Sequence, residues 1–233
     1  MGGPAEYDVS KYERPSVTVD VVIFSLRSNE LQVLLVQRKQ WPYEGMWAIP
    51  GGFVRMDEGL EQAARRELAE ETGVDDPEIY LEQLYTFGAP CRDPRTRVIT
   101  VAHFALIPSE HLFLRASSDA AAADWYAASR PPPLAFDHAG ILAYAIRRLR
   151  YKIEYTALAF QLLPEVFTLT ELQNAYEHIL GESLDKRNFR RKVLAAGVLE
   201  GTSHVRGGGH RPARLYRFRP DAVAEVKARR LFP

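Results

Sequence analysis

The first half of the chain combines apolar segments of strand character with one long helical segment. Residues 16–26 and 31–37 are rich in β-branched and apolar side chains with a polar turn between them, which predicts two connected strands. Residues 80–87 and 98–107 have the same character, and Asp93-Pro94 marks a turn between them. Residues 58–72 favour a helix that Gly73 ends as a C-terminal cap. Strands around one helix predict a mixed α/β module.

A proline run near the middle of the chain precedes a second set of elements. Residues 131–133 are consecutive prolines, which cannot continue a strand or a helix and therefore predict a stiff connector. A long helical pattern opens at Asp137 and reaches residue 151. We expect this helix to close the first module and to lead the chain into the second.

The second module has the pattern of two short capped helices followed by a hairpin. Thr168 and Glu171 form a capping box, and the helix that they begin ends at Gly181. A second helix starts at Asp185 after a turn of a few residues, which predicts a helix-turn-helix. Residues 198–218 surround a run of three glycines at 207–209, which predicts a β-hairpin with a flexible, basic tip.

The two modules carry opposite charge. The 233 residues include 30 basic and 30 acidic ones, but residues 1–150 hold 16 basic and 21 acidic residues, whereas residues 151–233 hold 14 and 9. We therefore predict two domains with different partners, over residues 1–150 and 151–233. The alternative for the basic domain is an ordinary solvated face.

Composition also indicates the compartment. Cys91 is the only cysteine, which excludes a disulfide framework and a multi-cysteine zinc site. We expect Cys91 to be an ordinary buried thiol, since no His or Asp lies at a telling spacing. The sequence contains no apolar run of the roughly 18 residues that a membrane span requires, and its first residues are polar. These features predict a cytoplasmic protein without a membrane partner.

Three glutamates on the first predicted helix form the strongest candidate site. Glu67, Glu70 and Glu71 are spaced i, i+3 and i+4, so their carboxylates project from one side of the helix. Like charges this close repel each other unless a cation neutralises them, and hard oxygen ligands suit Mg²⁺ or Mn²⁺. Arg66 can orient one carboxylate, and the backbone at Gly51 can approach a metal or a phosphate. A solvent-exposed acidic helix is the alternative.

Arginines and a glycine outside this helix are candidates for binding a phosphorylated ligand. Arg38 ends a predicted strand, and Arg92 and Arg97 belong to a turn that holds three arginines. Gly52 lies in the turn just before the helix. An ordinary surface arginine is the alternative for Arg38.

The second helix of the basic module has one apolar face and one basic face. If Phe189 points inward, Arg187 and Arg191 point outward and Arg190 lies at the edge. Arginine can bond to guanine edges or to phosphates in the major groove, and the basic hairpin resembles the wing of a winged helix. The candidate DNA-binding residues are Lys186, Arg187, Arg190, Arg191, Arg206, His210, Arg211 and Arg214.

Residues 52–74 resemble a complete Nudix box, because every fixed position of that pattern is filled from Gly52 through Glu58 to the segment 66–74. The resemblance implies an α/β/α sandwich and the hydrolysis of a nucleoside diphosphate linked to another group. It implies Arg66, Glu67, Glu70 and Glu71 as catalytic residues, and Glu67, Glu71, Glu70 and the Gly51 carbonyl as metal ligands. The base of many members is a loop carboxylate without a fixed motif, for which Asp119 and Glu110 are candidates.

With its basic tail the chain resembles the NrtR family, the Nudix-related transcriptional regulators of NAD metabolism. The resemblance rests on residues 136–138 with the helix that follows, and on 167–173, 184–192 and 207–218. It implies a Nudix domain followed by a C-terminal winged helix-turn-helix domain. It also implies a homodimeric repressor that binds double-stranded operator DNA of NAD synthesis or salvage genes and releases it when ADP-ribose or a related nucleotide occupies the Nudix domain.

The complete box leaves two functions open. Many regulators of this family have a damaged box, whereas every catalytic position is present here. The chain is either a regulator that keeps its glutamates to hold the ligand, or a Mg²⁺-dependent ADP-ribose pyrophosphatase that releases AMP and ribose 5-phosphate and carries the winged helix as an accessory domain. A protein that does both is the third interpretation.

Overall fold

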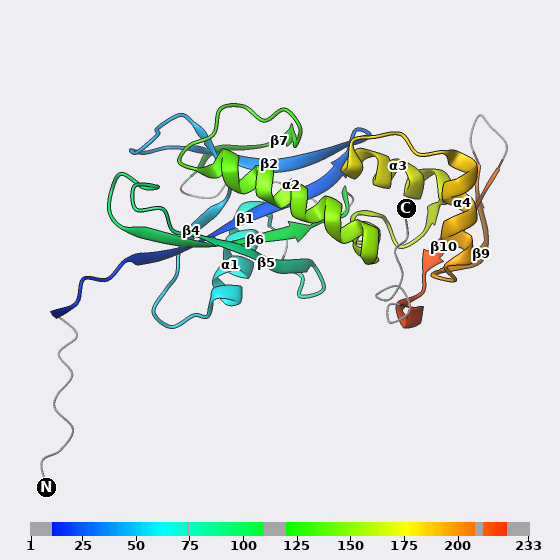
Figure 1. Cartoon of the computed structure of the whole chain (residues 1–233), viewed down its shortest axis with the longest axis horizontal. Helices are drawn as coiled ribbons and strands as arrows, with labels where there is room; N and C mark the ends of the chain where they lie inside the picture. The colour runs from blue at the N-terminus through cyan, green and yellow to red at the C-terminus, as the bar shows by residue number, and fades with distance from the viewer. Residues whose placement is uncertain (1–10, 74, 110–119, 208–211, 223–233) are drawn as a thin grey trace, which may run out of the picture.

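The structure, a computed structural model, describes residues 11–73, 75–109, 120–207 and 212–222. Figure 1 shows a large sheet with its helices at one end of the molecule and a small helical domain at the other. The long helix α2 (His138–Tyr155) crosses the sheet and ends beside the small domain. Among the described residues, no helix is both long enough and apolar enough to cross a membrane.

One mixed sheet forms the first domain. Along its main path the strands are β3 (Trp47–Ala48), β2 (Glu30–Arg38), β1 (Ser16–Arg27), β6 (Val98–Leu106) and β5 (Tyr80–Phe87). In addition, β4 (Gly51–Phe53) pairs with β1, and β7 (Ala120–Ala127) pairs with β2. β1 and β6 run parallel, whereas β2 and β4 both pair with β1 in antiparallel fashion.

The side chains of β1 alternate between the two faces of this sheet. Val19, Val21 and Ile23 pack with the apolar side of α1 (Leu60–Thr72). Val22 and Phe24 pack instead with the apolar side of α2. A strand that is buried on both faces is apolar along most of its length, as residues 16–26 are. The sheet between two helices confirms the predicted α/β fold.

Helix α1 differs from its prediction only at its start. It begins at Leu60 rather than at residue 58, because the backbone N–H of Gly59 donates to the side chain of Gln62 and Gly59 becomes the N-cap. Glu58 stays outside the helix and bonds to Arg66. The predicted end is confirmed, since Gly73 is the C-terminal cap with a left-handed φ of 71°.

The second domain is a winged helix. Its elements are η3 (Leu158–Leu162), β8 (Phe167–Thr168), α3 (Leu169–Leu180), α4 (Lys186–Ala195), β9 (Leu199–Arg206), β10 (Ala213–Phe218) and η4 (Pro220–Ala222), and the strands pair in the order β8-β10-β9. Both predicted caps are confirmed. The Thr168 hydroxyl accepts from the Glu171 N–H at 3.1 Å, and Asp185 accepts from the Asn188 N–H at 2.8 Å.

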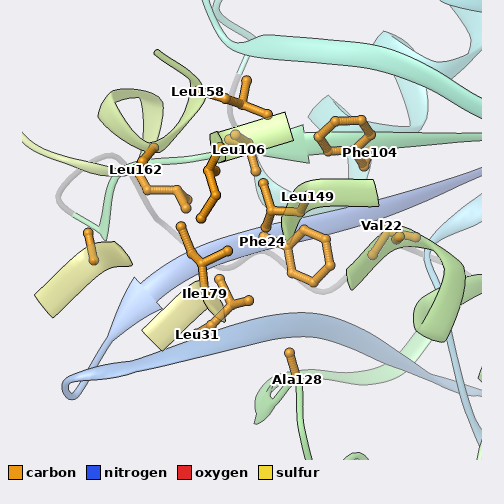
Figure 2. Packing of buried hydrophobic residues seen from close by; sticks show 14 of the residues in the cluster. Val22, Phe24, Leu31, Phe104, Leu106, Ala128, Leu149, Leu158, Leu162 and Ile179 are labelled. Atoms are coloured by element: carbon orange, nitrogen blue, oxygen red, sulfur yellow. The ribbon is translucent and has the colours of Figure 1, made fainter. Parts of the chain in front are cut away.

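The two domains share one apolar core. Leu149 of α2 and Phe24 of β1 belong to the same cluster as Leu162 and Ile179 of the second domain, and Figure 2 shows these side chains grouped around the end of β1. The Arg150 side chain of α2 also donates to the backbone carbonyl of Ile179 at 2.9 Å. Helix α2 therefore contributes to the packing of both domains, in agreement with its expected place between them.

Two interpretations of the sequence are incomplete or wrong. The alanine-rich segment 120–127 forms strand β7, which the sequence analysis did not predict, and the proline run only joins β7 to α2. Ala135, just beyond the run, still donates its N–H to the Trp47 carbonyl at 2.8 Å. Cys91, which we expected to be an ordinary buried thiol, is exposed.

Candidate ligand cavity and DNA-binding surface

A cavity of about 590 Å³ opens between α1, the glycine turn before it and the loops that follow β2 and β5. It gathers most of the residues that the sequence marked as catalytic, metal-binding or ligand-binding, namely Arg38, Gly51, Gly52, Arg66, Glu67, Glu70, Glu71 and Arg92. Arg97 is not among the described residues that line it. The candidate bases Asp119 and Glu110 lie outside the described residues.

Arg66 holds the acidic groups of this cavity together. Its guanidinium donates to Glu58 at 3.0 and 2.7 Å, to Glu67 at 2.6 Å and to Glu70 at 3.4 Å. The hydrogen bonds from Arg66 lower the pKa of Glu58 from 4.5 to about 2. The orienting role predicted for Arg66 is therefore visible in its contacts, and Glu58 keeps this arginine in place.

Replacing Glu58 with glutamine is expected to destabilise the fold at neutral pH but not in strong acid. The pKa of Glu58 is about 2 in the folded protein and 4.5 for an ordinary glutamate, which represents the unfolded chain. The charged carboxylate therefore stabilises the fold fully above about pH 4.5, and this stabilisation disappears as the pH falls toward 2. Thermal unfolding of wild type and Glu58→Gln across this range will show converging midpoints. A constant difference between the two proteins would contradict this assignment.

Glu67 is buried where its carboxylate loses solvation. Glu67 is only 7% exposed, and a Cβ placed on Gly52 would lie 2.3 Å from the nearer oxygen of the Glu67 carboxylate. Burial raises the pKa of Glu67, the Arg66 contact opposes this effect, and the charges of Glu70 and Glu58 add to it. Only a glycine at position 52 lets the glutamate approach this closely, and a cation beside it would favour the ionised form.

The adjacent glycine brings two strands together. A Cβ on Gly51 would lie 2.3 Å from the Val19 carbonyl oxygen and 2.7 Å from an Asp20 carboxylate oxygen. Gly51 pairs with Asp20 in the β1–β4 ladder. The glycine pair therefore places β4 against β1 and forms the edge of the cavity next to α1.

A cluster of polar groups at the cavity was not predicted: Asp20, Arg92 and His138 line the cavity, and Asp137 bonds to Arg92. Arg92 donates to both carboxylate oxygens of Asp137 at 2.9 and 2.7 Å, and one of its nitrogens lies 3.5 Å from Asp20. His138 accepts the Ile49 N–H through its Nδ1 at 2.9 Å. The lone aspartate inside the apolar run of β1 was the available signal for Asp20. Nothing in the sequence pairs residue 92 with residue 137.

Two further arginines flank an aromatic ring in the cavity wall. The Arg38 guanidinium lies 4.8 Å from the centre of the Phe136 ring, and that of Arg95 lies 5.8 Å from it. Burial, followed by the charge of Arg95, lowers the pKa of Arg38. Arg97 points elsewhere and donates to the carbonyls of Ala89 and Val98 at 3.3 Å. Of these two arginines in the loop, Arg95 is the one that lines the cavity.

The carboxylates of α1 match a divalent cation in chemistry but are not grouped around one point. Glu67 and Glu71 are buried at the cavity and supply the hard oxygen ligands that Mg²⁺ prefers. Within the described residues, however, no group of three or more His, Cys, Asp or Glu is close enough to hold an ion. Arg66 instead draws Glu67 and Glu70 toward itself.

The exposed face of α4 carries the predicted basic residues. Phe189 and Val193 are buried, whereas Arg187 and Arg191 are exposed, as the helical periodicity predicted. Lys186 is exposed as well. Arg190 lies at the edge, where it donates to the Thr170 hydroxyl at 2.9 Å. The cationic surface of α4 therefore consists mainly of the first two residues and of Arg191.

The wing arginines bond within their own domain. Arg206 forms an ion pair with Glu171 and donates to the Val166 carbonyl at 3.3 Å. The Arg214 guanidinium covers Gly201, where a Cβ would lie 2.3 Å from its nearest nitrogen. His210 and Arg211 lie outside the described residues. In the described part of the wing, Arg206 is therefore held by Glu171 of α3, and Arg214 lies over Gly201 of the hairpin.

Comparison with known families identifies both halves of the chain. Residues 16–149 match the NUDIX domain, and residues 159–218 match the NrtR DNA-binding winged helix domain. The ADPR responsive transcriptional repressor NtrR of Acinetobacter baylyi is 44% identical over 218 residues, which cover 92% of this chain and 86% of that relative. The chain belongs to the NrtR family. Both the family and the two-part fold expected from the sequence are thereby confirmed.

Solved NrtR structures have the same architecture. Shewanella oneidensis NrtR complexed with a 27mer DNA superposes with a TM-score of 0.78 at 39% identity, covering 89% of this chain and 95% of that one. The NUDIX domain of the same NrtR complexed with ADP ribose superposes with a TM-score of 0.56 at 38% identity, over 62% of this chain and 95% of that one. Both NrtR domains are therefore present in this chain in one continuous arrangement.

Proposed function

We propose that this chain is an ADP-ribose-responsive transcriptional repressor of NAD synthesis or salvage genes. One observation carries the proposal: the same apolar core joins two different functional surfaces. The first surface is a cavity lined by arginines and carboxylates, and the second is a helix-turn-helix whose helix α4 exposes cationic side chains. The names of the NrtR relatives, which mention an ADPR response, a bound 27mer DNA and bound ADP ribose, support it.

In this proposal the cavity binds the pyrophosphate of ADP-ribose. Arg38 and Arg95 offer cationic groups at the cavity wall, and Gly52 leaves room beside Glu67. Glu67 and Glu71 are the residues that would hold Mg²⁺ or Mn²⁺, with Glu70 and the Gly51 carbonyl as further ligands. The metal, when bound, would supply positive charge toward the phosphates. Removal of divalent ions with a chelator is then expected to weaken ADP-ribose binding.

The opposite end of the molecule binds DNA in this proposal. Lys186, Arg187 and Arg191 of α4 contact the major groove, and Arg190 and the wing residues Arg206, His210, Arg211 and Arg214 contact the backbone. A homodimer would place two such helices on two half-sites of an operator. Size-exclusion chromatography with light scattering, with and without DNA, measures this oligomeric state.

Operator binding in the presence and absence of ADP-ribose tests the function directly. Full-length protein is titrated into a labelled duplex from upstream of an NAD-biosynthesis gene, and fluorescence anisotropy follows binding at several salt concentrations. We expect tight binding with a steep salt dependence and weaker binding when ADP-ribose is added. Binding that is equal on an unrelated duplex, or that ignores ADP-ribose, would overturn the proposal.

A pyrophosphatase activity is the second candidate, because the full set of box residues lines the same cavity. Incubation of ADP-ribose with the protein and Mg²⁺ is expected to release AMP and ribose 5-phosphate if this activity exists. Glu71→Gln would abolish the release, whereas Glu61→Gln would not, since Glu61 lies on the same helix but pairs with Arg65 in solvent. Absence of AMP from wild type would eliminate this candidate and leave the repressor proposal standing.

Replacing Gly52 with alanine is expected to weaken ADP-ribose binding by about 10- to 100-fold, the usual effect of disturbing a group that positions a metal ligand. The added methyl group would meet the Glu67 carboxylate at 2.3 Å and force it out of place. Calorimetric titration measures the affinity. Gly88→Ala is the matched control, because its nearest neighbour would lie at an ordinary 3.8 Å. Equal affinity of Gly52→Ala and wild type would refute this role of the glycine.

A further inference from the structure

The start of helix α2 is part of the ligand cavity. Phe136, His138 and Arg92 line it. Arg92 donates two hydrogen bonds to the carboxylate of Asp137, the N-cap residue of α2. The segment before α2 is also fixed to the sheet, since the Ala135 N–H bonds to the Trp47 carbonyl and His138 accepts the Ile49 N–H. A ligand in the cavity therefore lies against the first turn of α2.

The other end of the same helix belongs to the DNA-binding domain. Leu149 and Ile153 pack in the cluster that contains Leu172 and Ile179 of α3, and Arg150 bonds to the Ile179 carbonyl. Helix α2 is 18 residues long, which corresponds to about 27 Å at 1.5 Å per residue. One rigid element thus extends from the cavity wall to the helix-turn-helix.

Asp137 occupies an N-cap position without capping the helix. Its side chain makes no hydrogen bond to the first N–H groups of α2, and its φ and ψ of −95° and 16° lie outside the extended region of an ordinary N-cap. The carboxylate is directed instead to Arg92. The His138 and Gly140 N–H groups already bond to the carbonyls of Ala135 and Asp137 at 3.2 and 2.9 Å. Asp137 therefore has two alternative partners, the guanidinium of Arg92 and the Ala139 N–H in the first turn of α2, and the structure shows the first.

We infer that the Arg92–Asp137 ion pair is the contact through which an anionic ligand in the cavity changes the position of α2 and thereby the affinity for DNA. This inference rests on the proposed function. A pyrophosphate competes with the carboxylate for Arg92, because it offers the guanidinium charged oxygen acceptors of its own. The released Asp137 then caps α2, which requires its backbone to move into the extended region. Arg92 and Asp137 are accordingly positioning residues for the response to ligand.

Substitution of Asp137 by asparagine separates the two partners. Asparagine is a good N-cap but has no charge to hold Arg92, so Asp137→Asn favours the capped arrangement in the absence of ligand. We expect its operator Kd without ADP-ribose to approach the Kd of wild type saturated with ADP-ribose. The ratio of the two Kd values then falls to within about twofold of 1, while ADP-ribose itself still binds, because the coupling and not the ligand site is removed.

Asp93→Asn is the matched control. It breaks the ion pair between Asp93 and Arg95, two residues that line the same cavity. The distance in this pair is 2.7 Å, as in the Arg92–Asp137 pair, but both of its residues belong to the loop after β5 and neither caps α2. Whatever it does to ADP-ribose affinity, the ratio of operator Kd values at saturating ADP-ribose should remain that of wild type. A variant Asp137→Asn that keeps the wild-type ratio would overturn the inference, whereas a wild type without any response would overturn the proposed function instead.

Hydrogen exchange of the wild-type protein provides a readout that does not depend on a variant. Capping by Asp137 protects the Ala139 N–H near the start of α2, so ADP-ribose should slow the exchange of that amide. The His138 and Gly140 N–H groups are already bonded to backbone carbonyls and should respond less. Amides at the start of α3, which Thr168 already caps, should change by less than those of α2. Unchanged exchange at the start of α2 on saturation with ADP-ribose would also overturn the inference.

Discussion

A chain with both Arg187 and Arg191 replaced by alanine is expected to bind operator DNA roughly 30-fold more weakly or worse. Each arginine that bonds to a base edge or phosphate contributes about 1–3 kcal/mol, so loss of both removes roughly 2–6 kcal/mol. Both side chains are exposed on α4, opposite the buried Phe189 and Val193. Anisotropy titrations at several salt concentrations measure the affinity and its salt slope, which should decrease by up to about one unit per lost phosphate contact.

The matched control removes the same charge from a different part of the domain. Arg217 bonds to Glu200 at 2.9 Å, and Arg219 pairs with Asp221 at 2.6 Å. Replacing both with alanine lowers the net charge of the chain as much as the α4 variant does, and it should change operator affinity far less. If the two double variants weaken binding equally, net charge rather than the α4 surface determines the affinity.

Features that depend on neighbouring residues were predictable from the sequence. The helical spacing placed Glu67, Glu70 and Glu71 on one side, and all three line the cavity. Capping motifs gave the C-terminal end of α1 and both helix starts of the winged helix, because a cap depends only on residues within about one turn of the helix end. The amphipathic period likewise separated Phe189 from Arg187.

Contacts between distant segments were not predictable in this way. The Arg92–Asp137 pair joins residues 45 positions apart, and the bond from Ile49 to His138 spans 89. No local pattern encodes either partner, since each contact exists only after β4, the loop beyond β5 and the start of α2 have come together. The sequence therefore identified the glutamates, Arg38 and Arg92 as lining residues, but not the contacts that join Arg92 to Asp137 and Ile49 to His138.

Tertiary pairing also overrode local preference at β7. Alanine has low strand propensity, and residues 120–123 are all alanine, so the segment gave no strand signal. Its backbone nevertheless pairs with β2 from Gln32 to Arg38. Small side chains suit this position because Ala123 packs at the edge of two apolar clusters. The charge difference between the halves, by contrast, suggested different partners, and it carried no information on the core that the halves share.

That common core leads to a prediction on stability. Phe189→Ala is expected to destabilise the whole chain by about 3–5 kcal/mol, the usual cost of truncating a buried phenylalanine. The side chain is 2% exposed and packs edge-on against Tyr176 with 5.5 Å between ring centres. Since its cluster extends through Ile179 to Phe24 of β1, the two domains should unfold in one transition. For a chain of this size the midpoint should fall by roughly 6–20 °C.

Leu194→Ala is the control on the same helix, because Leu194 is 48% exposed and its truncation leaves the core intact. Differential scanning calorimetry of both variants and wild type distinguishes the outcomes. A single transition that moves as a whole in Phe189→Ala, and hardly moves in Leu194→Ala, is the result that the continuous cluster requires. Two transitions, with only one of them shifted by Phe189→Ala, would mean that the domains unfold independently and that the apolar contacts between them contribute little to stability.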